Sequence, residues 1–127
     1  MSGGLTYDTG ALLAAEAARR EIWALHRRSL ERGHRPVVPV GVLGQAWRGG
    51  PQAALSRLLE GCQIEPLDEK GARAAGVACA RSGIADIVDA TVVLGALARD
   101  DLIVTSDPDD LSRIAEALRR RVRLVAI

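Results

Sequence analysis

Short apolar runs alternate with helical segments along the whole chain, and this alternation restricts the possible folds more than any other feature of the sequence. The predicted strands are residues 4–8, 35–40, 63–68, 102–106 and 122–127. The predicted helices are residues 9–33 (as one helix or two), 41–50, 52–62, 69–83, 82–98 and 107–120. Because strands that alternate with helices form a parallel sheet with helices on both faces, we expect an α/β fold.

Residues 82–98, SGIADIVDATVVLGALA, are predicted to form one helix that is apolar on almost every side. A helix of this kind is normally buried. Asp86 and Asp89 nevertheless lie in its first turns, three residues apart and therefore on one side. Because a buried carboxylate costs free energy unless it is paired or binds a metal, these two aspartates are candidates for a functional site.

Two further aspartates are predicted to lie at the same edge of the sheet. Asp8 ends the first predicted strand, and Asp107 follows the strand 102–106. Ligands gather at the carboxyl ends of parallel strands, and the helix 82–98 begins at that edge because it leads into the strand 102–106. We therefore expect Asp8, Asp86, Asp89 and Asp107 to share one cleft. Such an oxygen-rich site is typical of Mg²⁺ or Mn²⁺.

The same aspartates also have a purely structural interpretation. Asp107 or Asp109 precedes a helix with Pro108 near its first position, which is the pattern of an N-cap. Asp86 lies near a helix start, where the helix dipole favours a carboxylate. For each aspartate taken singly, capping and metal binding stay open; the four together favour a site.

Composition excludes several other classes of protein. The net charge is +1 and the only aromatic residues are Tyr7, Trp23 and Trp47, so neither a polybasic nucleic-acid binder nor an aromatic stacking platform is expected. Cys62 and Cys79 lack the spacing of a zinc site or a disulfide framework and suit a reducing compartment. No leader pattern and no apolar run of about 18 residues occurs, so we expect a cytoplasmic protein without membrane contact.

Four segments, LTYDTGALLA, VPVGVLGQAWRGG, ADIVDATVV and IVTSDPDDL, resemble in order the motifs of PIN-domain ribonucleases, specifically the VapC-type toxins of bacterial toxin–antitoxin modules. The resemblance implies one PIN domain over residues 1–127, with a three-layer α/β/α fold and a parallel sheet of about five strands. It also implies metal-dependent RNA cleavage, in which water activated by Mg²⁺ or Mn²⁺ attacks the phosphodiester. In this resemblance Asp8, Asp86 and Asp107 match family acids, Asp89 is an auxiliary acid, and Thr105 is the accompanying hydroxyl residue.

One position departs from the family pattern. Gln45 stands where the family usually has a glutamate, and an amide keeps a coordinating oxygen but loses the negative charge. Weaker metal affinity follows, and a degenerate PIN domain that binds RNA or an antitoxin without cutting remains an alternative. Arg48 is a candidate for contact with RNA phosphate, or else a surface arginine. A phospho-acceptor receiver domain is disfavoured because it needs a lysine after its last strand, whereas Lys70 lies in a mid-chain helix.

The resemblance also implies partners. It predicts a cognate antitoxin whose C-terminal segment covers the cleft. Independent support comes from an apolar row in the predicted helix or helices 9–33, made of Leu12, Leu13, Ala17, Ile22, Leu25 and Leu30. This row suits a groove for a partner helix, a homodimer contact or simply the core. His26 and His34, in the same region, are expected to be exposed to solvent, and neither lies in the four motifs.

Overall fold

The computed structural model describes residues 3–127 and contains one parallel sheet in the strand order β3-β2-β1-β4-β5. The strands are β1 Leu5–Tyr7, β2 Val37–Pro39, β3 Gln63–Glu65, β4 Leu102–Thr105 and β5 Arg123–Ala126. Every neighbouring pair is parallel. All five predicted strands are therefore present, each somewhat shorter than predicted.

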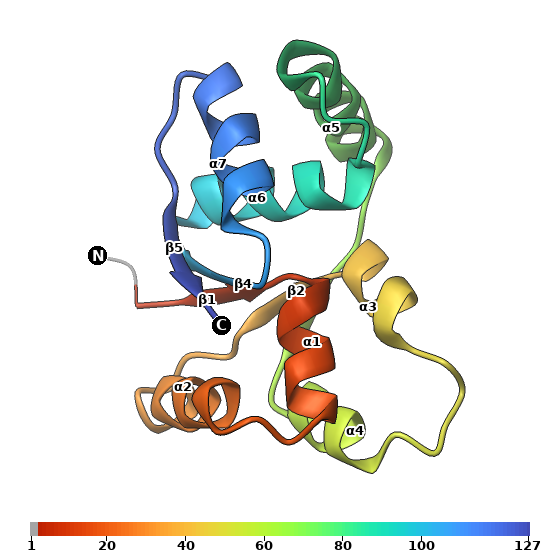
Figure 1. The fold of residues 1–127 in the computed structure, drawn as a ribbon, viewed down its shortest axis with the longest axis vertical. Helices are drawn as coiled ribbons and strands as arrows, with labels where there is room; N and C mark the ends of the chain where they lie inside the picture. Colours follow the sequence, from red (N-terminus) through yellow and green to blue (C-terminus); the bar gives the residue numbers. More distant parts are fainter. Residues whose placement is uncertain (1–2) are drawn as a thin grey trace.

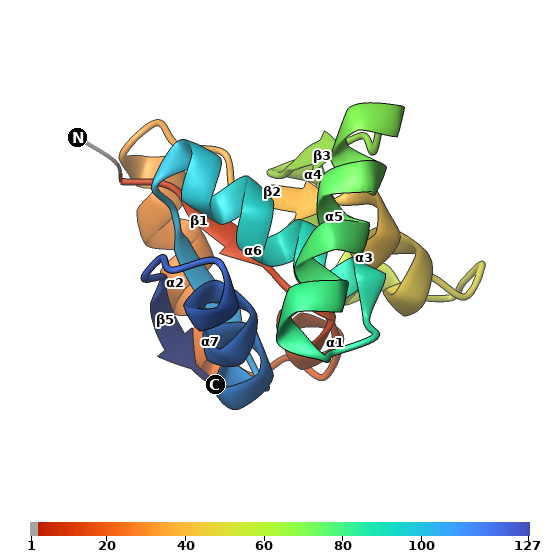
Figure 2. The same cartoon turned by 90° about the horizontal axis from the view of Figure 1, so that it is seen from above.

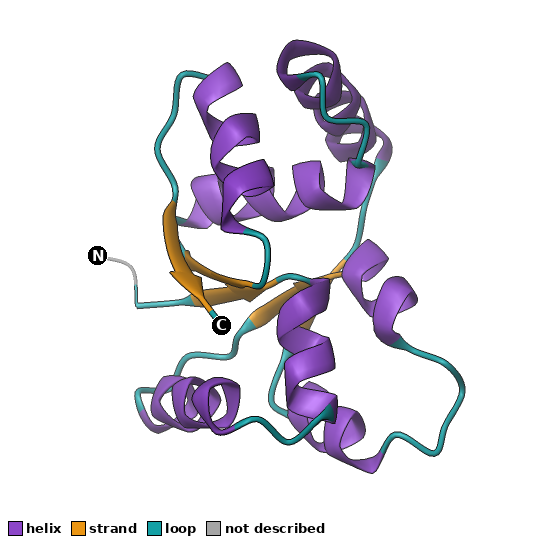
Figure 3. Cartoon of the chain, in the orientation of Figure 1, coloured by secondary structure: helices purple, strands orange, loops and turns teal. Residues whose placement is uncertain are grey.

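Helices cover both faces of this sheet (Figures 1 and 3). The helices are α1 Thr9–Glu16, α2 Arg20–Glu31, α3 Val40–Ala46, α4 Ala53–Glu60, α5 Glu69–Ser82, α6 Ile87–Arg99 and α7 Pro108–Ala117. In Figure 1, α5, α6 and α7 lie above the sheet, while α1, α2 and α4 lie below it. Seen from above in Figure 2, α6 lies over β1, with α5 on one side of it and α7 on the other. The predicted three-layer α/β/α architecture is confirmed.

The chain changes direction within the sheet between β1 and β4. From β1 it continues through β2 to β3 on one side and then returns through β4 to β5 on the other. In open α/β sheets, ligands bind outside the carboxyl ends of the strands at such a switch point. Asp8 follows β1 and Asp107 follows β4, so the topology brings the first and last predicted acids to this position.

The helix predicted over residues 82–98 begins later than expected. α5 ends at Ser82, and its C-cap is Gly83, whose φ of 73° is a left-handed conformation that glycine adopts without steric cost. α6 starts at Ile87 with Asp86 as its N-cap, so Asp86 lies outside the helix that was predicted to contain it. The expectation of a helix buried on every side is also wrong, because Ile87 is 43% exposed.

The predicted helical region 9–33 forms two helices, which divide its apolar row. Ala18, with a φ of 58°, lies in the break between α1 and α2. Leu12 and Ile22 are fully buried in the core, whereas Leu13 is 52% and Leu30 is 40% exposed. The row is therefore part core and part surface.

The expectation that His26 is exposed to solvent is wrong. His26 is buried, and its Nδ1 lies 2.8 Å from the hydroxyl of Tyr7, which is itself fully buried in β1. Burial lowers the pKa of His26, which favours the neutral ring. Cys62 and Cys79 are both free thiols. None of the helices in residues 3–127 combines the length and apolar content needed to cross a membrane.

Candidate metal centre at the carboxyl edge of the sheet

Asp8 lies at the junction of β1 and α1. It is 5% exposed, and its Oδ1 accepts a hydrogen bond from the backbone N–H of Ala11 at 2.9 Å, so it is the N-cap of α1 rather than the last strand residue. Its Oδ2 accepts a hydrogen bond from the hydroxyl of Thr105. These bonds fix the Asp8 carboxylate between β1 and β4, at the switch point of the sheet.

Asp86 and Asp89 occupy the start of α6. The Oδ1 of Asp86 accepts a hydrogen bond from the backbone N–H of Asp89 at 3.0 Å. This bond shows the capping role that the sequence left open for Asp86. Asp89 lies in the first turn of α6 and is half-buried. Because the side chain of Asp86 caps this helix, the carboxylate of Asp89 has no capping role.

Asp107 and Asp110 lie at the start of α7. The backbone N–H of Asp107 donates to the hydroxyl of Thr105 at 2.8 Å, which ties the turn after β4 to the residue that holds Asp8. Carboxylate oxygens of Asp89, Asp107 and Asp110 lie within 4.8 Å of one another, close enough to share one cation. Asp8 and Asp86 are not part of this tight group.

Asp110 was missed as a candidate ligand. In the sequence it was only one of three acids at the predicted start of a helix. The available signal was its spacing: Asp107 and Asp110 are three residues apart, which places them on one side of a helical turn. The same spacing had been noted for Asp86 and Asp89.

Burial and neighbouring carboxylates raise the pKa values of Asp8, Asp89 and Asp107. The pKa of Asp89 is raised to about 7, first by burial and then by Asp86, Asp8, Asp107 and Asp110. Burial is also the largest cause that raises the pKa of Asp8 and of Asp107. The charges that act on Asp89 are all negative, so the site as it stands favours an added positive charge.

Two features of the backbone allow the acids to lie so close together. α1, α6 and α7 all begin at this edge, and the positive ends of their helix dipoles favour nearby carboxylates. Gly10, in the first turn of α1, lies so close to the turn after β4 that a Cβ there would be 1.8 Å from the Oγ of Ser106. The absence of a side chain at Gly10 lets the start of α1 approach the start of α7.

Gln45 and Arg48 have different positions relative to these acids. The Oε1 of Gln45 accepts a hydrogen bond from the hydroxyl of Thr9, the residue after Asp8, which places Gln45 at the margin of the site. Arg48 is exposed, and its Nη1 donates to the carbonyls of Trp47 at 2.7 Å and Gly44 at 3.4 Å. The Arg48 guanidinium is therefore turned back onto the end of α3.

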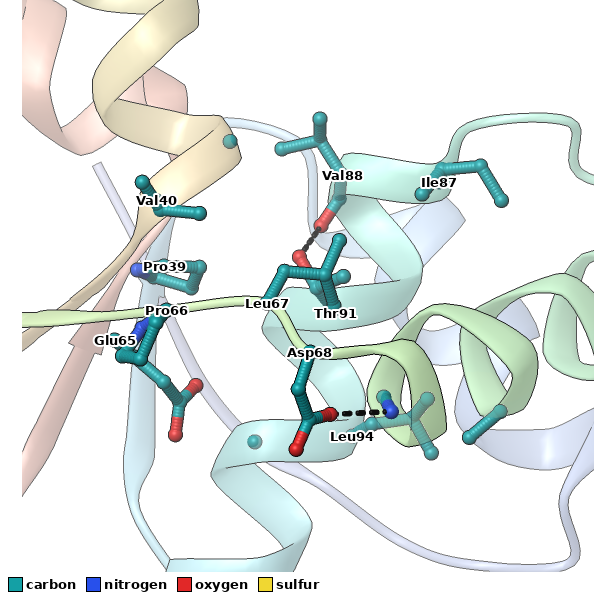
Figure 4. Close-up of a pocket in the computed structure, with 14 residues that line it drawn as sticks. Pro39, Val40, Glu65, Pro66, Leu67, Asp68, Ile87, Val88, Thr91 and Leu94 are labelled. Atoms are coloured by element: carbon teal, nitrogen blue, oxygen red, sulfur yellow. Dashed lines mark hydrogen bonds between the residues drawn. The ribbon is translucent and has the colours of Figure 1, made fainter.

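An apolar hollow of about 310 Å³ lies beside the start of α6 (Figure 4). Val40 of α3, Leu67 of the loop before α5 and Ile87 of α6 line it, and each is more than 40% exposed. In Figure 4 Leu67 lies between Val40 on one side and Ile87 on the other, and Asp68 caps α5 at the lower margin. Ile87 lies next to Asp86 in the chain, so the hollow adjoins the acidic site.

Comparison with known proteins places the fold. No family model and no curated protein matches the sequence. Among solved structures, a chain in the crystal structure of VapBC2 from Rickettsia felis, bound to a DNA fragment from their promoter, is similar with a TM-score of 0.67. The alignment covers 98% of each chain at 16% sequence identity. The chain therefore shares its fold with a chain of that complex, and the predicted PIN-like three-layer α/β/α architecture is the one observed.

Proposed function

We propose that residues 1–127 form a single PIN domain that acts as a metal-dependent endoribonuclease toxin in the cytoplasm. One observation carries this proposal: Asp89, Asp107 and Asp110 present oxygens within 4.8 Å of one another, and the charges that raise the pKa of Asp89 are other carboxylates. The similarity in fold to a chain of the VapBC2 complex supports the same conclusion.

The residues at this edge fit Mg²⁺ or Mn²⁺. The available donors are carboxylate oxygens without histidine or thiolate, which is the donor set of hard divalent cations. Asp89, Asp107 and Asp110 would hold the ion, with Asp8 and Asp86 adding negative charge close by. A divalent cation bound there would activate water as the nucleophile and would stabilise negative charge on the phosphodiester.

The neighbouring residues position this set. Thr105 donates to Asp8 and accepts from the backbone of Asp107, so one hydroxyl sets the distance between two acids from different strands. Asp86 fixes the first turn of α6 and thereby the place of Asp89. Arg48, once released from its carbonyl partners, would bind a phosphate of the RNA at the end of α3.

The alternative function is a degenerate PIN domain that binds RNA or an antitoxin with little or no cleavage. The observation in its favour is Gln45, which supports the site through Thr9 but adds no charge. Five carboxylates remain without it, which is why we favour the active enzyme.

A cleavage assay with matched aspartate variants tests the proposal. Purified protein with Mn²⁺ should cut RNA, and Asp89→Asn or Asp8→Asn should lower the rate by about 100-fold or more, since each removes charge at the reacting phosphate. Asp68→Asn is the control, because Asp68 also caps a helix but lies outside the acidic group. Equal rates for the wild type and Asp89→Asn would exclude this site as the nuclease centre.

Two protein partners belong to this proposal. A cognate antitoxin would cover the exposed part of the early helices, where Leu13 and Leu30 are accessible. A second copy of the chain would bury the hollow formed by Val40, Leu67 and Ile87. Co-expression of this chain with the neighbouring reading frame should give a complex of the two proteins and should relieve the growth arrest caused by this chain alone. Light scattering should show a dimer that Leu67→Glu dissociates; a monomeric wild type would refute the homodimer.

A further inference from the structure

A second hollow, of about 320 Å³, lies where the strands of the sheet begin, at the edge opposite the acidic site. The hollow is lined by Arg28 in the last turn of α2, by Arg32, which follows the helix as its C-cap, and by Arg123 at the start of β5. Gly3 and Gly4 contribute backbone to the lining, just before β1. We call these five residues the basic hollow.

The positive charge of the basic hollow is only partly cancelled by its surroundings. Arg28 and Arg32 make no ion pair within residues 3–127, where the recorded pairs involve other arginines. Asp100 is engaged by Arg123, whose Nη2 lies 2.6 Å from its carbonyl and 3.5 Å from its Oδ1. Asp101, also near this edge, is engaged by Arg99 at 2.9 Å. Two guanidinium groups therefore remain available to an anion.

The end of α2 that carries these arginines is firmly held. Ser29 is buried, and its hydroxyl donates to the carbonyl of His34 at 3.0 Å, which closes the turn after the helix. Gly4 lies so close to Asp101 that a Cβ there would be 2.4 Å from its Oδ1, so no side chain fits at that point. The hollow is thus defined by fixed backbone, with flexible guanidinium groups along one side.

Resting on the proposed function, we infer that the basic hollow binds the phosphodiester backbone of the RNA substrate outside the cleft. The acidic site repels a polyanion except where a cation neutralises it, so RNA gains affinity from positive surface elsewhere. The forked guanidinium of arginine matches phosphate oxygens. Arg28 and Arg32 lie four residues apart at the end of α2 and line the same hollow, so they can engage neighbouring phosphates of one strand.

Binding of single-stranded RNA in EDTA, which prevents cleavage, tests the inference with a matched pair of variants. Arg28→Gln/Arg32→Gln should weaken binding about 10-fold and reduce the slope of log K against log salt by about 1.4, or 0.7 for each lost phosphate contact. Arg20→Gln/Arg27→Gln removes the same charge from another face of α2 and should change affinity by about twofold or less. Equal losses in the two variants would refute the assignment to the basic hollow.

Substrate length provides a second readout. An RNA of about 4 nucleotides occupies only the cleft, so the Arg28→Gln/Arg32→Gln variant should cleave it as fast as the wild type does. For an RNA of about 16 nucleotides, the same variant should have a lower kcat/KM, by most of the 10-fold loss expected in binding. Unchanged binding and cleavage of the long RNA would overturn the inference and leave the nuclease intact. Loss of antitoxin binding alone would assign the hollow to an acidic protein segment and also overturn it. A wild type that neither binds nor cuts RNA would refute the proposed function itself.

Discussion

Asp8 and Asp101 are the buried aspartates of residues 3–127, and their surroundings are opposite in charge. Asp101, 7% exposed, accepts hydrogen bonds from Arg99 and Thr6, both at 2.9 Å. Asp8, 5% exposed, is held by the Thr105 hydroxyl and by backbone N–H groups, and the charge that acts on it is the negative charge of Asp107.

The difference is the one expected between a structural carboxylate and one that we propose belongs to a metal site. A buried anion with a cationic partner is complete within the protein, and removing the partner leaves a costly charge. A buried anion that is held in place by neutral groups and surrounded by other anions is a site for a cation from solution. Thr6 and Thr105 have the same role in the two sites, so the presence of Arg99 is what distinguishes them.

The largest expected effect on stability comes from removing the cation at Asp101. Arg99→Met should lower the free energy of unfolding by about 3 kcal/mol, because Asp101 and Glu65 both lose their partner while Asp101 stays buried. Urea denaturation measures this change. Arg73→Met, which breaks the exposed pair with Glu69, should cost at most about 0.5 kcal/mol.

A double variant separates charge from packing at this position. Arg99→Met/Asp101→Asn should recover part of the lost stability, since the neutral amide can still accept from Thr6. If the double variant is less stable than Arg99→Met, the ion pair is not what stabilises this part of the fold.

At the acidic site, stability without metal should fall as the pH rises. The pKa of Asp89 is raised to about 7, so the folded state retains a proton that the unfolded chain releases near pH 4. This contribution to stability is complete below about pH 4 and is lost as the pH passes about 7. We expect a loss of about 1–2 kcal/mol, discounted because Asp89 is partly exposed.

The measurement compares the wild type with Asp89→Asn in EDTA at pH 5 and pH 8. The difference in stability between the two proteins is needed at each pH, because the lowered pKa of His26 makes stability change with pH in the opposite direction. Asp89→Asn should become the more stable protein at pH 8, and Mg²⁺ should stabilise only the wild type. If Asp89→Asn is less stable than the wild type at pH 8, and the difference in stability between the two is the same at pH 5 and pH 8, the proposed repulsion is contradicted.

The fold was largely predictable from the sequence because it depends on patterns of many residues. Alternation of apolar and helical segments identified all five strands and the α/β class, and four spaced motifs indicated the PIN-like topology. Boundaries were less accurate. Asp8 and Asp86 were placed inside a strand and a helix, whereas both are N-caps, because a capping hydrogen bond ends one element and starts the next within a single residue.

The acidic site was predictable only to the level of the sheet edge. Topology brings Asp8, Asp89 and Asp107 to that edge, but which oxygens lie close together depends on the entry angles of α6 and α7. These angles follow from packing, so the sequence did not identify Asp110 as a member and left the capping role of Asp86 as one of two alternatives. The cation at Asp101 was equally hidden, because Arg99 meets Glu65 across 34 residues.

The approach of α1 to the turn after β4 gives a smaller effect with an unusual sign. Glycine to alanine in a helix normally stabilises by up to about 1 kcal/mol, as we expect for Gly76→Ala, where a Cβ meets nothing within 4 Å. Gly10→Ala should instead destabilise by about 1 kcal/mol, since its Cβ would overlap Ser106. Thermal denaturation compares the two, and Gly10→Ala/Ser106→Gly should restore stability. Stabilisation by Gly10→Ala alone would show that the contact is not tight.

The smallest effect concerns the charge of the acidic site itself. Gln45→Glu adds a carboxylate next to Thr9 while keeping the oxygen that accepts its hydrogen bond. Stability without metal should change by about 0.5 kcal/mol or less because the side chain is exposed. Mn²⁺ affinity, measured by calorimetry, should rise about threefold or more, since added ligand charge strengthens cation binding. Gln63→Glu is the control, because it makes the same change of charge on the edge strand β3. A rise in both variants would indicate a general effect of net charge, and a fall in Gln45→Glu alone would mean that Gln45 does not face the metal.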